Sequence, residues 1–238
     1  MKLDILAFAA HPDDVEISAG ATLLKYAKEG KKIGIVDLTL GELGTRGSID
    51  IRRDEAQKAA EKIGLEIREN VRMKDGFFEI NESNKLTIIQ VIRKYQPTII
   101  LANSISDRHP DHARAGQLVA EAAFLSGLRK IETFENDILQ PVHRPNLVLH
   151  YIQDHYIKPD VVLDVSSFVD EKIELIKCYN SQFYNPNSKE PETPISGEEF
   201  FDFLKGRMLG FGRSIGVRYA EGFNSSRQLG IKDLFDLK

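Results

Sequence analysis

Near its N-terminus the chain reads LDILAFAAHPDD (residues 3–14), an apolar run that gives way at once to a polar, acidic loop. Such a short apolar run is typical of a central strand that is buried on both faces of a sheet. A helical pattern follows from Ile17 to Glu29, and Gly30 is a typical helix end. The sequence therefore predicts a strand, a polar loop and a helix, the unit from which parallel α/β sheets are built.

The same unit recurs along the chain. Further strands are predicted at 33–38, 98–102, 147–152 and 161–165, with strand-like pieces in 65–80 and a strand or turn at 217–223. Helices are predicted at 50–63, 85–95, 112–126 and 167–180, and Ser196 and Glu199 predict a capping box for one more. Residues 181–197 predict a long loop. We expect a single α/β domain over 1–238, a Rossmann-like, mostly parallel sheet flanked by helices, with an elaborated C-terminal half.

Composition narrows the classes of protein. With 238 residues, one large domain is expected. The net charge of −4 argues against non-specific electrostatic binding of nucleic acid. An anionic ligand would have to be bound by a local cluster of Arg or Lys. A lone cysteine, Cys178, allows no intrachain disulfide and fits a reducing, cytoplasmic setting. No stretch approaches the roughly 20 apolar residues of a membrane span, and we expect no secretory signal.

Two polar clusters carry the candidate chemistry, His11-Pro12-Asp13-Asp14 and His109-Pro110-Asp111-His112, and each follows a predicted buried strand. Ligands bind at the carboxyl ends of strands in open α/β sheets, so the two loops can meet if their strands are close. His11, Asp14 and His112 then offer two imidazoles and a carboxylate, a donor set that suits a catalytic divalent metal with an open position. Asp13 would aim at a metal-coordinated water as general base. His109, oriented by Asp111, would be an imidazolium that stabilises an oxyanion.

Other interpretations of these clusters stay open. Either cluster alone fits a helix-initiating loop, because Asp is a common N-cap and Pro a common first helical residue. Two histidines and one carboxylate also match the facial triad of non-haem iron oxygenases. The glycines at 41, 44 and 47 do not fit a dinucleotide fingerprint, because they follow the second strand with the spacing G-x-x-G-x-x-G.

The two clusters resemble those of the PIG-L-like (LmbE-like) family of zinc-dependent N-acetylglucosamine deacetylases. Loop sequences further resemble the branch that removes acetate from N-acetylglucosaminyl malate in bacillithiol biosynthesis. These loops are Gly41 to Gly47, Asp107 to His112, Ser181 to Phe183 and Tyr219 to Phe223. The resemblance implies zinc, with Fe²⁺ as an alternative, a small sugar conjugate as substrate, and a homo-oligomer such as a hexamer.

Carried over to matching positions, the resemblance implies that His11, Asp14 and His112 are metal ligands. It implies Asp13 as general base, His109 as electrostatic catalyst and Asp111 as its orienting partner. It also implies substrate contact by Arg52, and Arg46, Arg108 and Lys189 are further candidates for contact with carboxylates. A catalytic tyrosine from a mobile loop is found in the family, and either Tyr184 or Phe200 falls at that place here.

Three other functions remain open at this stage. The first is a deacetylase for a different conjugate, such as a chitobiose-like sugar. The second is an amidase of thiol conjugates, which would cleave a larger amide. The third is a Rossmann-like module that binds a nucleotide or sugar without catalysis, and its binding would not respond to a chelator.

Overall fold

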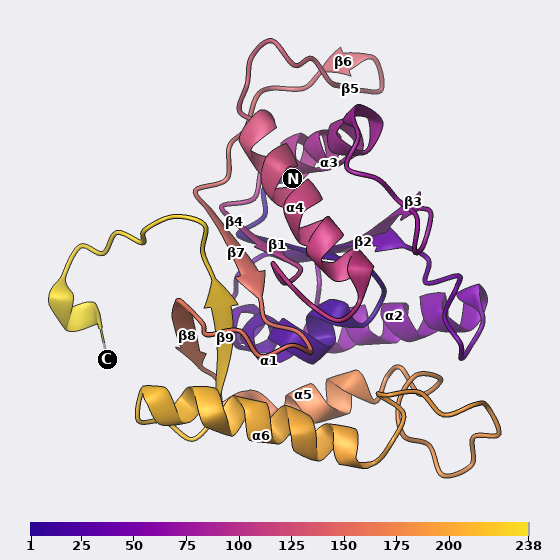
Figure 1. Cartoon of the computed structure of the whole chain (residues 1–238). Coiled ribbons are helices and arrows are strands. Elements are labelled where there is room, and N and C mark those ends of the chain that lie inside the picture. Colours follow the sequence, from indigo (N-terminus) through magenta and orange to yellow (C-terminus); the bar gives the residue numbers. More distant parts are fainter. Residues whose placement is uncertain (238) are drawn as a thin grey trace.

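A seven-stranded sheet forms the centre of the computed structural model, which describes residues 1–237 (Figure 1). In spatial order the strands are β3 (Ile67–Met73), β2 (Ile33–Thr39), β1 (Ile5–Ala9), β4 (Ile99–Ala102), β7 (Leu147–Tyr151), β9 (Ala220–Asn224) and β8 (Val161–Asp164). Only β9 runs antiparallel to its neighbours in this sheet, and the other strand pairs are parallel. The predicted α/β fold with a mostly parallel sheet is confirmed.

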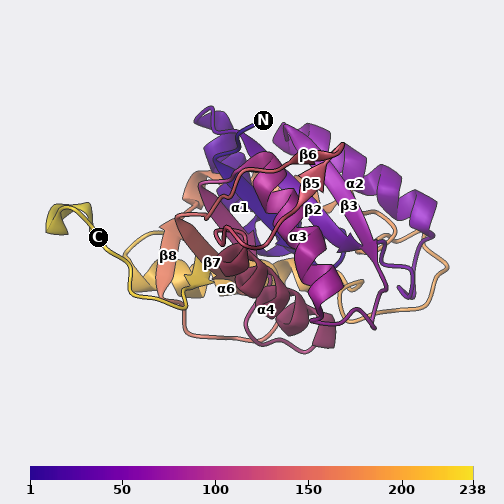
Figure 2. The same cartoon turned by 90° about the horizontal axis from the view of Figure 1, so that it is seen from above.

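Helices cover both faces of the sheet, as Figures 1 and 2 show from two directions. One face packs against α1 (Asp14–Lys28), α2 (Ile49–Ile63), α5 (Val169–Ile176) and the start of α6 (Glu199–Ser214). The other face packs against α3 (Glu82–Tyr95) and α4 (Pro110–Leu125). Among the helices of the described residues, none has the length and apolar character that a membrane crossing requires.

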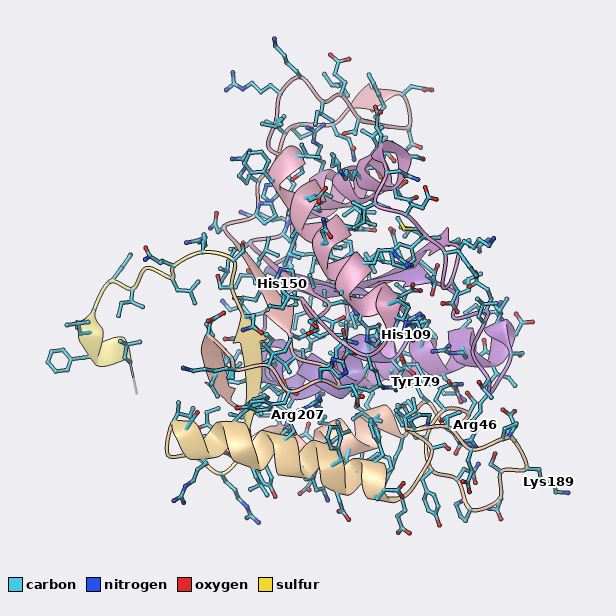
Figure 3. The ribbon with its side chains drawn as sticks, viewed as in Figure 1. Arg46, His109, His150, Tyr179, Lys189 and Arg207 are labelled. Atoms are coloured by element: carbon cyan, nitrogen blue, oxygen red, sulfur yellow. The ribbon has the colours of Figure 1, made fainter. Side chains whose placement is uncertain are left out.

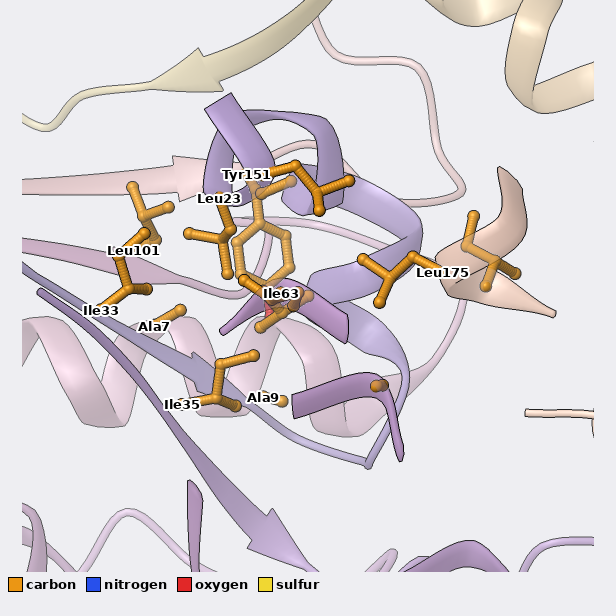
Figure 4. Packing of buried hydrophobic residues seen from close by; sticks show 14 of the residues in the cluster. Ala7, Ala9, Leu23, Ile33, Ile35, Ile63, Leu101, Tyr151 and Leu175 are labelled. Carbon is orange, nitrogen blue, oxygen red and sulfur yellow. The ribbon is translucent and has the colours of Figure 1, made fainter. Parts of the chain in front are cut away.

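Strand β1 explains why its sequence is an unbroken apolar run. Its side chains alternate between the two faces, and both faces are covered by helices. Ile5, Ala7 and Ala9 join the core beneath α1 and α2, part of which is shown in Figure 4 with Ala7 and Ala9 labelled. Leu6 and Phe8 join the core beneath α3 and α4. Every residue of the strand is at most 4% exposed.

The C-terminal half departs from expectation in four places. The predicted helix at 167–180 is a 3₁₀ turn, η1 (Ser166–Phe168), followed by the shorter α5. A small hairpin, β5 (Phe134–Glu135) and β6 (Ile138–Leu139), was not predicted, and a second 3₁₀ turn, η2 (Leu234–Asp236), lies near the C-terminus. The predicted capping box at Ser196 is wrong, because its hydroxyl accepts the Thr193 N–H at 2.8 Å within a preceding turn. The predicted loop at 181–197 holds no helix or strand.

A buried charge network fixes α1 against the sheet. The Arg68 guanidinium contacts Glu16 Oε1 at 2.5 Å and donates to both Asp37 oxygens, at 2.8 and 2.9 Å. The Tyr179 hydroxyl donates to the same Glu16 oxygen at 2.7 Å. Burial raises the pKa of Asp37, and the Arg68 charge opposes that rise. The network anchors the first turn of α1, which immediately follows the candidate site.

Candidate active site

The two polar clusters meet because their strands are neighbours. Strands β1 and β4 pair in parallel, with Ile5 opposite Ile99, so the loops that follow them lie side by side at the carboxyl edge of the sheet. Strands β2 and β3 lie on one side of β1, whereas β4 and the later strands lie on the other side. The position between β1 and β4 is therefore a topological switch point, which is where open α/β sheets bind ligands. A cavity of about 230 Å³ opens there. That is far more than the roughly 10–15 Å³ that one water needs, so the cavity has room for a small molecule.

The predicted metal ligands bring three donor groups to one point. His112 Nε2 lies 3.1 Å from Asp14 Oδ1, and His11 Nδ1 lies 3.7 Å from Asp14 Oδ2. Tetrahedral zinc with bonds of roughly 2.0–2.1 Å holds its ligand atoms about 3.3 Å apart. Both pairs are close to that spacing, although they involve different Asp14 oxygens. The groups whose donor atoms all lie within 4.8 Å of one another are His11, His109 and His112, and His11, Asp75 and Asp111. His109 is close as well, since its ring nitrogen lies within 4.8 Å of those of His11 and His112.

A second observation supports a metal site. Each of the two predicted histidine ligands places its other ring nitrogen next to a carboxylate. His11 Nε2 lies 3.0 Å from Asp75 Oδ1, and His112 Nδ1 contacts Asp107 Oδ2. Histidines that bind metals characteristically donate the second ring N–H to such a partner, which fixes the tautomer that leaves the first nitrogen free. Sequence reasoning did not identify Asp75 or Asp107. The available signals were that Asp75 follows β3 at the same edge and that Asp107 lies in the loop before His112.

Asp14 is held by amide donors from two other segments. Asn103 Nδ2 donates to Asp14 Oδ2 at 3.0 Å, and Gln153 Nε2 donates to Asp14 Oδ1 at 3.1 Å. The His150 ring contacts the Asn103 carbonyl at 2.8 Å and so supports this arrangement. Burial alone would raise the pKa of Asp14, but the His112 charge and hydrogen bonds from His11 bring it well below its usual range. Asp14 is therefore ionised, as a metal ligand must be.

Asp13 occupies a strained position beside this centre. Its φ angle is 117°, in a region that costs a residue other than glycine roughly 1–3 kcal/mol. Arg52 holds the loop in place by donating to the Pro12 carbonyl at 2.7 Å and lying 3.4 Å from Asp13 Oδ2. Burial raises the pKa of Asp13 to about 7, and the Arg52 charge opposes that rise. A carboxylate of this kind can exchange a proton near neutral pH.

His109 and Asp111 are arranged differently from expectation. The Asp111 carboxylate contacts the Gly76 N–H at 2.7 Å, the Arg114 guanidinium and, at 3.4 Å, His11 Nε2. The expected orientation of His109 by that carboxylate is wrong, because His109 Nδ1 instead accepts the backbone N–H of Asp111 at 3.2 Å. Burial and the charges of His11 and His112 lower the pKa of His109, which disfavours the expected imidazolium. The neutral ring then carries its proton on Nε2.

The predicted substrate-binding arginines separate into two groups. Arg52 and Arg108 line the cavity, and Arg108 pairs with Asp154 at 2.7 Å. Arg46 is not among the residues that line the cavity, and its predicted substrate contact stays a prediction. Its guanidinium turns instead to Ser188 and tethers the loop that precedes α6. Lys189 is exposed and points outward from that loop (Figure 3).

The far side of the cavity comes from α6, which sequence reasoning overlooked. Phe200, Phe203, Leu204 and Arg207 all line the cavity. Their spacing of i, i+3, i+4 and i+7 places them on one face of the helix, a pattern that the sequence did contain. Phe200, and not Tyr184, reaches the cavity, so no tyrosine is found among the described lining residues.

A parallel α/β sheet with a strained acidic loop and a His/Asp donor set at its switch point defines a metal-dependent hydrolase. The sequence profile of the PIG-L family, described as GlcNAc-PI de-N-acetylase, matches residues 6–123. The crystal structure of the conserved protein TT1542 from Thermus thermophilus is similar throughout. It has a TM-score of 0.84 and 32% identity, and the match covers 97% of this chain and 98% of that one. The chain belongs to the PIG-L family.

Two curated relatives differ in the substrate that their names state. Diacetylchitobiose deacetylase of Thermococcus kodakarensis is 28% identical over 229 residues, covering 92% of this chain and 81% of the relative. Probable N-acetyl-alpha-D-glucosaminyl L-malate deacetylase 2 of Bacillus anthracis is 26% identical over 192 residues, covering 75% of this chain and 81% of the relative. Both names describe hydrolysis of an acetamide on a sugar, which agrees with the chemistry of the site.

Proposed function

We propose that the chain removes acetate from an N-acetylglucosamine conjugate, and specifically from N-acetyl-α-D-glucosaminyl L-malate. The observation that carries the chemistry is the convergence of His11, Asp14 and His112, with an outer carboxylate on each histidine. We propose zinc as the ion, and Fe²⁺ suits the same donors. When bound, the ion supplies a Lewis acid for the acetyl carbonyl and lowers the pKa of a water toward about 7.

Asp13 is proposed as the general base. It takes a proton from the water that attacks the acetyl carbon, and it later returns the proton to the sugar nitrogen as the carbon–nitrogen bond breaks. Acetate and a free amine leave. A pKa of about 7, raised by burial, allows the same carboxyl to accept and then donate. Arg52 keeps Asp13 in its strained conformation through the Pro12 carbonyl.

His109 is proposed to stabilise the oxyanion of the tetrahedral intermediate. Because Nδ1 accepts the Asp111 N–H, the proton of the neutral ring lies on Nε2, which can donate a hydrogen bond. Asp111 is proposed to act through His11, whose Nε2 lies 3.4 Å away. Arg52 and Arg108 remain proposed substrate contacts, because both line the cavity.

The experiment that tests this function is amine release from three compounds, with and without a chelator. They are N-acetylglucosaminyl malate, diacetylchitobiose and free N-acetylglucosamine. Chelator-sensitive release from the malate conjugate, with little from the other two, is the expected result. Faster release from diacetylchitobiose would retain the chemistry and refute the malate assignment. Chelator-resistant release would refute the metal mechanism.

Metal content tests the ligand set independently of turnover. His112→Ala is expected to lose the bound ion, because it removes one of three donors. His155→Ala is the matched control, since that side chain is exposed and does not line the cavity. A His112→Ala protein with full metal occupancy would show that the proposed ligands are wrong. Binding of a sugar by the metal-free protein, without turnover of any amide by the metal-loaded one, would favour a binding module.

A further inference from the structure

Arg207 is a cation without a partner in the wall of the cavity. It lies on the side of α6 that faces the sheet (Figure 3), and its guanidinium is 5.5 Å from the centre of the Phe203 ring. Among residues 1–237 this guanidinium has no hydrogen bond and no ion pair. A half-buried guanidinium that lines a cavity and is not paired with a protein group is free to bind an anionic ligand there.

The surrounding carboxylates do not neutralise Arg207. Burial lowers the pKa of Arg207 to about 10, while Glu221, Asp154 and Asp107 oppose that fall, so the guanidinium stays charged at neutral pH. Each of these carboxylates already has its own basic partner. Glu221 pairs with Lys172 at 2.6 Å, Asp154 pairs with Arg108 at 2.7 Å, and Asp107 contacts the His112 ring. Among the described residues, no carboxylate therefore forms an ion pair with Arg207.

Carboxylates and cations line different walls of the cavity. Asp13, Asp14 and Asp75 lie at the carboxyl edge of the sheet, where Arg52 pairs with Asp13. Helix α6 contributes Arg207, and the Asp154 carboxylate that also lines the cavity is already paired with Arg108. A ligand that places its acetamide beside the predicted metal ligands can therefore present its remaining part to Arg207.

We propose that Arg207 binds a carboxylate on the group attached to the sugar, and that it sets a preference for anionic over neutral conjugates. The proposal rests on the proposed function, because it takes the acetamide to lie beside the predicted metal ligands. Arg suits this task, since its planar fork can donate two parallel hydrogen bonds to one carboxylate. The Phe203 ring lies within cation–π distance of the guanidinium and helps to hold it in place.

The test compares Arg207→Gln, Arg207→Lys and Arg213→Gln on two substrates. These are N-acetylglucosaminyl malate and the neutral methyl glycoside of N-acetylglucosamine. Arg213 is the matched control, because it lies on the same helix but is exposed and outside the cavity. Arg207→Gln is expected to lower kcat/KM for the malate conjugate roughly 10- to 100-fold, mainly through KM, as expected for loss of a charged hydrogen bond. The neutral glycoside should lose far less.

The lysine variant and the control sharpen the result. Arg207→Lys keeps the charge but not the fork, so its loss should lie between those of the wild type and the glutamine variant. Arg213→Gln should change neither substrate more than about twofold. Equal losses on both substrates in Arg207→Gln, or a fall in kcat alone, would overturn the proposal. A melting temperature close to that of the wild type would show that the variant folds.

Failure of the proposed substrate can be separated from failure of this inference. If the wild type hydrolyses only the neutral glycoside, free L-malate is added as an inhibitor of that reaction. Arg207→Gln should then weaken inhibition by L-malate at least tenfold, and equal inhibition of both proteins would refute the role of Arg207. If nothing is hydrolysed, calorimetric binding of the malate conjugate provides the same comparison. Equal dissociation constants would be the refuting result.

Discussion

Replacing Asp107 by Asn tests whether an outer carboxylate controls the metal ligand His112. The Asp107 side chain is fully buried, with Oδ2 on His112 Nδ1 and Oδ1 accepting the His155 N–H at 2.7 Å. Burial would raise the pKa of Asp107, but its hydrogen bonds to His112 and to the backbone lower it, so it is ionised at neutral pH. An ionised carboxylate only accepts, which keeps the proton on Nδ1 and leaves Nε2 free for the metal.

Asparagine cannot satisfy both partners in this way. If its oxygen accepts from His155, its NH₂ group faces His112 Nδ1 and favours the tautomer with the proton on Nε2, which blocks the metal position. If its oxygen instead accepts from His112, the acceptor of that hydrogen bond is a neutral amide and no longer an ionised carboxylate. Such outer partners typically contribute 10- to 100-fold in metal affinity, or about 1.4–2.7 kcal/mol. We expect zinc affinity to fall by that amount.

Competition with a chromophoric chelator measures the affinity directly. Asp50→Asn is the control, because that side chain is 79% exposed and pairs only with Arg53 on the surface. Circular dichroism establishes that both variants are folded. Unchanged zinc affinity in Asp107→Asn would refute the argument that this carboxylate selects the tautomer.

Four further changes test other parts of the structure. Asp13→Asn should keep its bound metal yet lose roughly 100-fold or more in kcat, and an active, metal-replete variant would exclude this general base. Arg68→Met leaves two buried carboxylates unpaired and should cost roughly 3–5 kcal/mol in urea unfolding, whereas the exposed Arg53→Gln should cost less than about 1. Gly116→Ala should lower the melting temperature, because its Cβ would lie 2.6 Å from a backbone oxygen of the loop after β4. At Gly206 a Cβ meets nothing within 4 Å among the described residues, so Gly206→Ala should stabilise α6 by about 0.5–1 kcal/mol; a stabilised Gly116→Ala or a destabilised Gly206→Ala would contradict the packing.

The order of strands and helices could be predicted because its signals are local. β1 is buried on both faces, so its sequence is apolar throughout, and the polar cluster after it marks the strand end. The outer carboxylates could not be predicted in the same way. Asp75 reaches His11 across 64 residues of sequence, and that contact depends on β3, β2 and β1 pairing in register. The residues near Asp75 in the sequence do not indicate that these three strands pair.

The role of Glu16 could also not be predicted from the local sequence. Beside the N-terminus of a helix, an acidic residue ordinarily interacts with the helix dipole. The structure instead buries Glu16 completely against Arg68 and Tyr179, which come from β3 and from the segment after α5. A single acidic letter in the sequence does not distinguish a solvated helix start from a buried ion pair.

Two parts of the chain line the cavity. We expect one part to carry out the hydrolysis and the other to select the substrate. The family profile covers residues 6–123, which contain the proposed ligands, Asp13 and His109. Helix α6 lies beyond that range and supplies Arg207. The acetamide is common to the substrates in the names of both curated relatives, whereas the attached group differs. Because only the attached group would reach α6, changes on the cavity face of this helix should alter which conjugate is used while the hydrolytic step is retained.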